Sequence, residues 1–175
     1  PRRRPRPRLW GAGRSRVACR GEPGPAVARE PEEPVGLGYC SEAIDGIQPA
    51  ALWRSMLLKT GPRIVEFLPV TEVQTRAGEG FTWRSMKFVG PGPLSGKVIQ
   101  QHIYVDGAAG EIRFVPLEAD GTEAAEEVVN AMLREPLRVE YFRRRVGSKE
   151  RVHWPAPRSR TVAAIDRTVQ LAQPE

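Results

Sequence analysis

The sequence predicts an α+β fold in which one antiparallel sheet curls around a C-terminal helix. Between residues 70 and 145, apolar and polar side chains alternate in several short segments, as in half-buried strands. A segment with helical spacing follows near the C-terminus. The tetrapeptide WRSM occurs twice, at 53–56 and 83–86, in surroundings of different periodicity. A run of strands followed by a terminal helix is typical of an α+β domain.

The first predicted element is a strand within residues 35–45, where Leu37, Tyr39 and Ser41 alternate with small or polar residues. Asp45-Gly46 follows as a turn signal. Pro49 then suits the first turn of a helix. The apolar face of that helix is broad and consists of Leu52, Trp53, Met56, Leu57 and Leu58.

A second, shorter helix is predicted over residues 62–69, ended by Pro69. The first WRSM is therefore helical. The second WRSM lies in FTWRSMKFV, a β-branched and aromatic stretch bounded by Gly and Pro, so we expect a strand. There Trp83 and Ser85 face one way, and Arg84 and Met86 face the other. The two copies are thus not an internal repeat.

The following segments continue the sheet. Ile99, Ile103 and Val105 share one strand face with Gln101, and the opposite face carries Gln100, His102 and Tyr104. The next strand places Ile112 and Phe114 on one face. EAAEEVVNAML is ambiguous, because Glu and Ala favour a helix. The segment after it alternates Leu137, Val139 and Tyr141 against Arg138, Glu140 and Arg144, which is the clearest strand pattern in the chain.

The terminal helix, RSRTVAAIDRTVQLAQ, has an apolar stripe made of Val162, Ile165, Val169 and Ala172. Pro155 and Pro157 precede it and are expected to fix the direction from which the chain enters the helix. The predicted order is therefore strand, helix, helix, five or six antiparallel strands and a long C-terminal helix.

The positive charge is concentrated at the N-terminus. The formal net charge is +6, but residues 1–29 contain nine Arg and one acidic residue, which leaves 18 basic and 20 acidic side chains in the rest. A body with a net charge of −2 lacks the basic face of a nucleic-acid-binding domain. We therefore expect no nucleic-acid partner for the folded domain.

The domain boundary is predicted near residue 34. Residues 1–34 are rich in Arg, Pro and Gly and have no hydrophobic period, so we interpret them as a disordered leader. An organelle transit peptide for a plastid or mitochondrion is a second interpretation. A polybasic arm for nucleic acid or anionic lipid is a third. Residues 35–175 form the predicted domain. No apolar run approaches the length of a transmembrane helix, so an intracellular, soluble protein is expected.

Several kinds of chemistry are disfavoured. Cys19 and Cys40 do not form a disulfide framework, and with His102 and His153 they do not form a metal-ligand set. GPLSGK at 92–97 is too short for a phosphate-binding loop and is expected to be a hairpin loop. No serine lies in a nucleophile elbow. The sequence therefore implies no metal and no cofactor.

The order of elements resembles that of the START and birch-pollen-allergen superfamily, SRPBCC, and its AtaL-like branch in particular. The similar stretches span about 37–173 and are LWRSMLLKTGPRIVEFLP, GEIRFVPL, EEVVNAMLREPLRVEYFRRR, ERVHWPAP and TVAAIDRTVQLA. The resemblance implies a helix-grip fold: a curved seven-stranded antiparallel sheet around a long C-terminal helix, with two short helices between strands 1 and 2. It implies that EEVVNAM is a strand. It also implies a cavity between the sheet and the helix.

The resemblance leads to an expected ligand-binding site. A cavity of this type is mostly apolar, with a few placed polar groups. The expected lining residues are Trp53, Leu57, Phe67, Trp83, Phe88, His102, Phe114, Asn130, Tyr141 and Ile165. For His102 an outward position beside Gln100 is favoured over a role in ligand binding. For Asn130 a structural amide and a ligand-orienting amide are weighed equally.

Three functions remain open on the sequence. The first is binding or carriage of a small hydrophobic molecule, linked to secondary or lipid metabolism. The second is an enzyme of the cyclase or aromatase type, for which His102, Tyr104, Glu140 and Tyr141 are the candidate titratable groups. The third is an interaction module whose cavity is filled by its own side chains. Fold alone does not decide among them.

Overall fold

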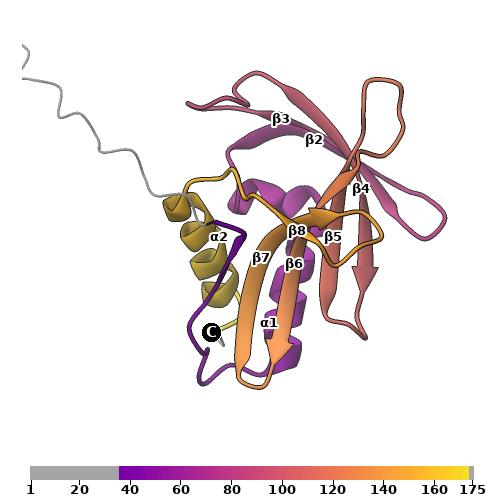
Figure 1. Cartoon of the computed structure of the whole chain (residues 1–175). Helices are drawn as coiled ribbons and strands as arrows, with labels where there is room; N and C mark the ends of the chain where they lie inside the picture. The colour runs from indigo at the N-terminus through magenta and orange to yellow at the C-terminus, as the bar shows by residue number, and fades with distance from the viewer. Residues whose placement is uncertain (1–35, 174–175) are drawn as a thin grey trace, which may run out of the picture. The chain divides into compact units, whose positions relative to one another are not determined.

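The computed structural model describes residues 36–173, and these form an α+β unit with one curved antiparallel sheet (Figure 1). Two α-helices and two short 3₁₀ segments accompany the strands. The elements in chain order are β1 (Gly38–Cys40), α1 (Pro49–Leu57), η1 (Leu58–Thr60), η2 (Pro62–Glu66), β2 (Val70–Ala77), β3 (Thr82–Phe88), β4 (Val98–Asp106), β5 (Glu111–Pro116), β6 (Glu126–Arg134), β7 (Leu137–Arg145), β8 (Arg151–Val152) and α2 (Arg158–Gln170). The predicted leader, residues 1–34, lies outside the described residues.

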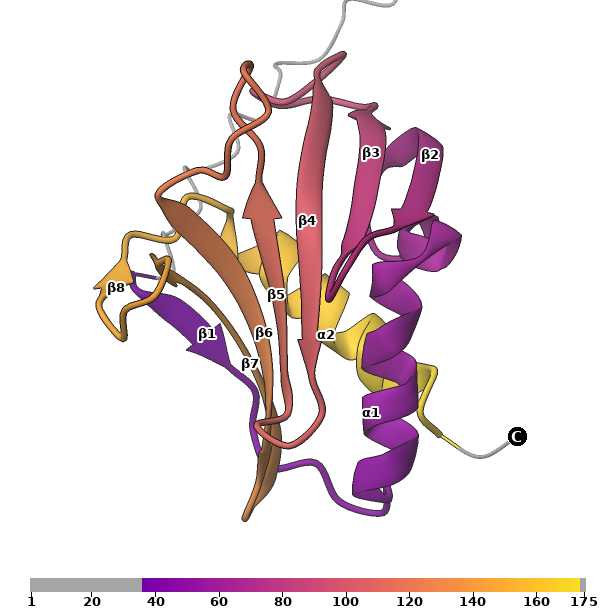
Figure 2. The same cartoon turned by 90° about the vertical axis from the view of Figure 1, so that its right-hand side faces the viewer.

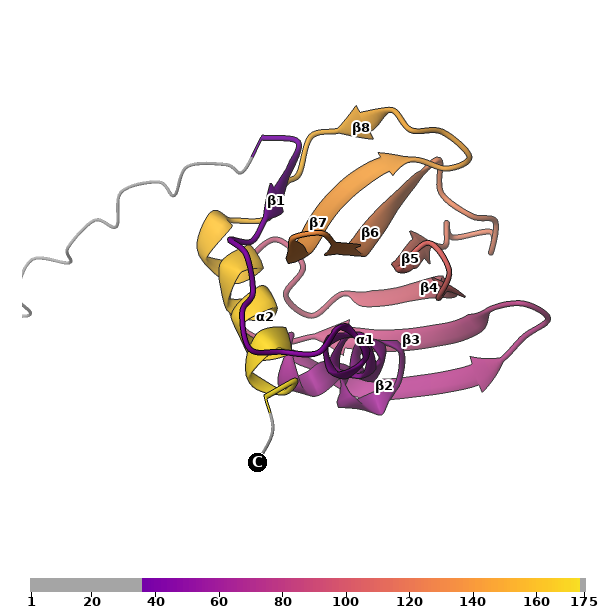
Figure 3. The same cartoon turned by 90° about the horizontal axis from the view of Figure 1, so that it is seen from below.

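The sheet has the strand order β1-β7-β6-β5-β4-β3-β2, and the short β8 pairs with β7. Consecutive strands from β2 to β7 are neighbours, so hairpins build most of the sheet. The strands curve around an open side, and α1 and α2 lie at that side (Figures 2 and 3). We call the face toward these helices the concave face and the other the convex face.

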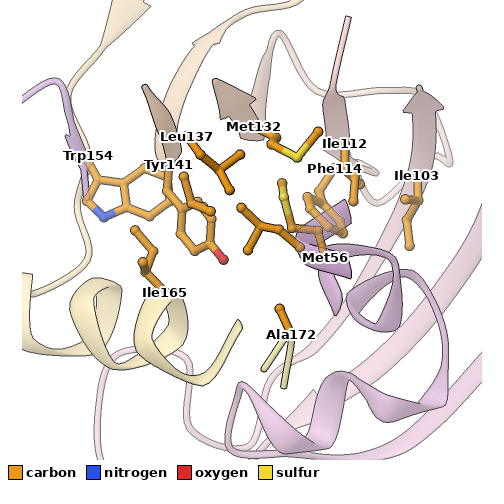
Figure 4. Close-up of a cluster of buried hydrophobic side chains, with 12 residues drawn as sticks. Met56, Ile103, Ile112, Phe114, Met132, Leu137, Tyr141, Trp154, Ile165 and Ala172 are labelled. Carbon is orange, nitrogen blue, oxygen red and sulfur yellow. The ribbon is translucent and has the colours of Figure 1, made fainter. Parts of the chain in front are cut away.

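The main core lies between the concave face and the two helices. Strand residues Ile103, Ile112, Phe114 and Tyr141 form one buried cluster with Ile165 of α2. Leu52 and Met56 of α1 belong to the same cluster, and both are fully buried. Figure 4 shows Tyr141 pointing from its strand into the middle of this cluster. At roughly 2 kcal/mol or more for each fully buried large apolar side chain, this cluster is the main source of the fold's stability.

The two WRSM segments take different structures, as predicted. The first lies in α1, where Met56 is fully buried and Trp53 packs at the edge of the core. The second lies in β3, where Arg84 and Met86 are buried on the concave face while Trp83 is half-buried on the other. The same four residues adopt a helix or a strand according to the period of their neighbours.

Three expectations from the sequence need correction. The first strand covers only Gly38–Cys40, and Leu37 before it is exposed. The second short helix is a 3₁₀ helix over Pro62–Glu66 that stops short of Pro69. The buried residues of α2 are Thr161, Ile165 and Thr168, and Ala172 is buried just beyond its end, whereas the predicted Val162 and Val169 are half-buried. Trp154 Nε1 donates to Thr161 Oγ1 at 2.9 Å, and Thr168 Oγ1 lies 3.1 Å from the Tyr141 hydroxyl, so both threonine hydroxyls have partners in the interior.

Candidate functional site

Lys59 is the most unusual side chain in the interior. It follows α1 directly and lies three residues after Met56 and seven after Leu52, so it continues the buried face of the helix. Its exposed fraction is 2%. Its Nζ atom is buried and has no hydrogen-bond partner in the described part of the chain. Because such an amine is costly to bury, its position calls for a physical reason.

Aromatic rings surround the Lys59 amine. Nζ lies 4.3 Å from the centre of the Tyr141 ring and 5.1 Å from that of Phe67. A ring face attracts a cation, but it does not replace lost hydration. Burial therefore lowers the pKa of Lys59 well below its ordinary value of 10.5.

The backbone at Lys59 is fixed by Arg84, which lies on the opposite side of the interior. Arg84 is 1% exposed, and its Nη1 donates to the carbonyl oxygen of Lys59. The amide oxygen of Gln101 in β4 is turned toward Arg84. It accepts a hydrogen bond from Arg84 Nε at 3.1 Å and another from Arg84 Nη2. The guanidinium carbon lies 5.4 Å from the centre of the Phe114 ring. Burial lowers the pKa of Arg84 to about 10.

The interior thus contains two buried basic side chains. In residues 36–173, the recorded ion pairs give neither Lys59 nor Arg84 a carboxylate partner. Arg84 donates to neutral oxygens, whereas the Lys59 amine lies over two aromatic rings and has no hydrogen-bond partner among the described residues. A buried basic group of this kind favours a hydrogen-bond acceptor or an anion as its partner.

Hydroxyl groups connect the two helices and the sheet beside this amine. The Tyr141 hydroxyl lies 3.1 Å from Thr168 Oγ1, which donates to the carbonyl of Ala164 at 2.7 Å. Ser55 Oγ of α1 donates to the carbonyl of Thr168 at 2.6 Å. These bonds hold α2 against both α1 and β7 and fix the ring that faces Lys59.

Two hollows of about 350 Å³ each open beside the helices. One is lined by Ala51, Ser55, Leu58 and Ala172, and the other by Tyr39, Ile44, Ile165 and Val169. Ile47 and Gln173 line both. The hollows therefore flank the segment that connects β1 to α1, which passes close to α2 in Figure 3. Ser55 in the first hollow lies one helical turn before Lys59.

The convex face carries a separate polar cluster around Glu123. Glu123 Oε1 accepts from the Tyr104 hydroxyl at 2.5 Å and lies 2.8 Å from His102 Nδ1. The His102 ring stacks on Phe81 with centres 4.0 Å apart. The Tyr104 hydroxyl and then His102 hold the pKa of the Glu123 carboxyl below its usual range, and Glu123 in turn raises the pKa of Tyr104. The cluster is partly exposed and borders no hollow described above.

An ion-pair network also lies on the convex face. Glu127 is 1% exposed and pairs with Arg144 at 2.7 Å and with Arg113 at 3.3 Å. Arg144 also binds Glu111. Arg144 lies over the ring of Phe142, which belongs to a small apolar cluster of the convex face. This network has a structural explanation, because it shields strand residues that no helix covers.

Eight of the ten predicted site residues lie in the interior or at its edges. Phe114, Asn130, Tyr141 and Ile165 are buried in the interior, and Asn130 is paired with Tyr141 and with Ile112 across the concave face. Four others lie at the edges of the interior: Trp53 and Leu57 at the main core, and Phe67 and Phe88 at a second core near β2.

Trp83 and His102 require a correction. They form a cross-strand pair on the convex face, where Arg76 lies over the Trp83 ring. Strand alternation turns both away from α2, so neither lines the interior. For His102, this is the outward position that the sequence analysis favoured.

Four buried polar residues of the interior were not predicted as site residues: Lys59, Ser55, Arg84 and Thr168. Each occupies a position where the local period points to the core, so the signal was present. It was overlooked because charged and hydroxyl side chains are seldom buried.

A metal centre finds no support in the described residues, since no three His, Cys, Asp or Glu side chains gather there. No helix in the described part of the chain has the length and apolar character needed to cross a membrane. No protein-family model matches the sequence, and a comparison with curated proteins also finds no match.

Proposed function

We propose that the protein binds a small hydrophobic molecule between the concave face of its sheet and α2, with Lys59 binding the polar end of that molecule. The observation that carries the proposal is the buried amine of Lys59, which lacks a hydrogen-bond partner in the described residues. The apolar cluster around it suits a hydrocarbon body. A carbonyl or carboxylate oxygen would be the missing acceptor.

The proposal includes the helix-grip fold of the SRPBCC superfamily, as the sequence resemblance implies. The curved antiparallel sheet and the C-terminal helix support it, as does the position of EEVVNAM in β6. Members of this superfamily include lipid carriers and polyketide cyclases. A role in secondary or lipid metabolism belongs to the same proposal.

We propose the hollows beside the β1–α1 connection as the route to the interior. Ile44 and Ile47 of this connection pack at the edge of the core rather than inside it. Ser55, which lines the first hollow, lies one helical turn before Lys59, so a movement of this connection would open the hollow toward the Lys59 side of the interior.

A cyclase or aromatase activity is the second candidate, and it needs a titratable group on the concave face. Of its four predicted residues, Tyr141 is directed inward, and Lys59 adds a second inward group. His102 and Tyr104 bind Glu123 on the convex face, and Glu140 pairs with Arg151. The enzymatic alternative would therefore use Lys59 and Tyr141.

A competition titration tests the binding proposal. The full chain is titrated with the neutral apolar dye N-phenyl-1-naphthylamine, and decanoic acid is then added as a competitor. We expect saturable binding of one dye per chain and displacement by the acid.

The Lys59→Met variant tests the role of the amine. A hydrogen bond to a charged group contributes about 1.5–3 kcal/mol, so Lys59→Met should weaken the binding of decanoic acid roughly tenfold or more. Lys97→Met, which changes an exposed lysine, is the matched control. Dye fluorescence that never saturates, or a Lys59→Met protein that binds the acid as wild type does, would contradict the proposal.

A further inference from the structure

The chain has four lysines, and their surroundings differ sharply. Lys97 and Lys149 are exposed, and Lys87 pairs with Glu72 at 3.0 Å on the surface. Lys59 is 2% exposed and has rings on two sides. A lysine amine in water is protonated at neutral pH, so it does not react as a nucleophile. A desolvated amine favours the neutral form, which keeps its lone pair.

In the described surroundings of Lys59 no hydrogen-bond acceptor or carboxylate holds the amine in its charged form, and the two ring faces near it do not replace its lost hydration. Its Nζ has no hydrogen-bond partner and no carboxylate within ion-pair distance among residues 36–173. The Arg84 guanidinium is bound to the backbone carbonyl oxygen of Lys59 and not to its amine. The lowered pKa of Lys59 agrees with this geometry.

The attachment of Lys59 to the fold also suits a reactive amine. Its backbone is fixed through Arg84 to β3, and its side chain extends to the Tyr141 ring of β7. The Tyr141 ring is itself held by the hydroxyl contact with Thr168. The amine therefore has a defined position between the sheet and α2, beside the apolar cluster that would hold a hydrocarbon chain.

We propose that the amine of Lys59 forms a reversible imine with the carbonyl carbon of a small hydrophobic aldehyde or ketone. This inference rests on the proposed function, because it concerns the same interior site. The amine lone pair forms a C–N bond while the carbonyl π pair moves to oxygen, and one amine proton transfers to that oxygen. The carbinolamine then loses its C–O bond and the second amine proton, and one water molecule leaves. No oxidant, reductant or metal is needed.

Reductive trapping of the full chain tests the inference. The protein is incubated at pH 7 with decanal and sodium cyanoborohydride, which reduces an imine to a stable secondary amine. Proteolysis and mass spectrometry then measure the decyl group on each lysine. A surface lysine with an ordinary pKa is neutral in roughly one molecule in a thousand or fewer at this pH. We expect Lys59 to be labelled at least tenfold faster than Lys97 and Lys149.

The controls separate this inference from the proposed function. Lys59→Met should lose the fast label and keep the slow ones. Unlabelled decanol, which has no carbonyl group, should slow the labelling of Lys59 by occupying the same space. If Lys59 is labelled no faster than Lys97, the proposal that Lys59 forms an imine is wrong. If decanol still displaces the dye in that case, binding stands and only the covalent step falls. If decanol does not displace the dye either, the proposed function falls as well.

Discussion

Replacing Lys59 with methionine should stabilise the protein in the absence of ligand, and the gain should depend on pH. Methionine has a similar length and carries no charge, so it removes the cost of burying the amine. The pKa of Lys59 is lower in the folded chain than its ordinary value of 10.5. The unfolded chain therefore binds a proton that the folded chain releases. Wild-type stability then falls as the pH decreases from about 10.5 toward the folded pKa.

The size of this effect has a firm upper limit. One proton per chain corresponds to at most about 1.4 kcal/mol per pH unit. The advantage of Lys59→Met over wild type should thus grow by up to this amount between pH 9 and pH 8, and should become independent of pH above about 10.5. For a domain of this size each kcal/mol shifts the melting temperature by about 2–4 °C.

Urea unfolding at pH 7, 8, 9 and 10, followed by tryptophan fluorescence, measures the difference. Lys97→Met is the matched control, because Lys97 is an exposed lysine. Its difference from wild type should be small and independent of pH. A constant difference between wild type and Lys59→Met over the same range would refute the reasoning, since it would mean that the amine keeps its ordinary protonation inside the fold.

Three further predictions concern the surroundings of the site. Glu127→Gln should lower the free energy of unfolding by about 2–3 kcal/mol, because a buried carboxylate with two arginine partners is lost. Urea unfolding measures this loss, and a midpoint equal to that of wild type would contradict it. Tyr141→Phe should cost about 1 kcal/mol through the lost hydroxyl contact with Thr168, and unchanged thermal stability would show that this bond contributes nothing. The pKa of Glu123 is lowered in the fold, so its contribution is present above the unfolded pKa and is lost as the pH falls through the folded one. In acid unfolding between pH 6 and pH 3, wild type should therefore lose more stability than Glu123→Gln, and parallel curves would argue against the contact.

The architecture could be predicted from periodicity because most elements have one clear apolar face. The strand over Leu137–Arg145 alternates as expected, and the two WRSM segments separate by the period of their neighbours. The segment Glu126–Arg134 was ambiguous on composition. It is a strand because Glu127 finds arginines on the convex face while Asn130 and Met132 face the core, and these tertiary contacts outweigh helix propensity.

The candidate site was harder to predict, because its polar residues are buried against the usual rule. Lys59 and Thr168 occupy core positions by helical spacing, but their side-chain types suggest exposure. Arg84 was expected to share a face with Met86, and its burial follows once that face is turned toward the helices. Trp83 and His102 were expected at the site as an aromatic and a polar candidate, and strand alternation places them on the other face.

Native mass spectrometry of the full chain, purified from a cell extract, shows directly whether the folded protein holds a small hydrophobic molecule. The mass of the folded protein is compared with the mass after denaturation, for wild type and for Lys59→Met. The account predicts that folded wild type carries an additional small lipophilic mass that denaturation releases, and that Lys59→Met carries much less of it. A bare chain mass for folded wild type, together with no binding of the apolar dye, would mean that the interior is filled by its own side chains and would contradict the account.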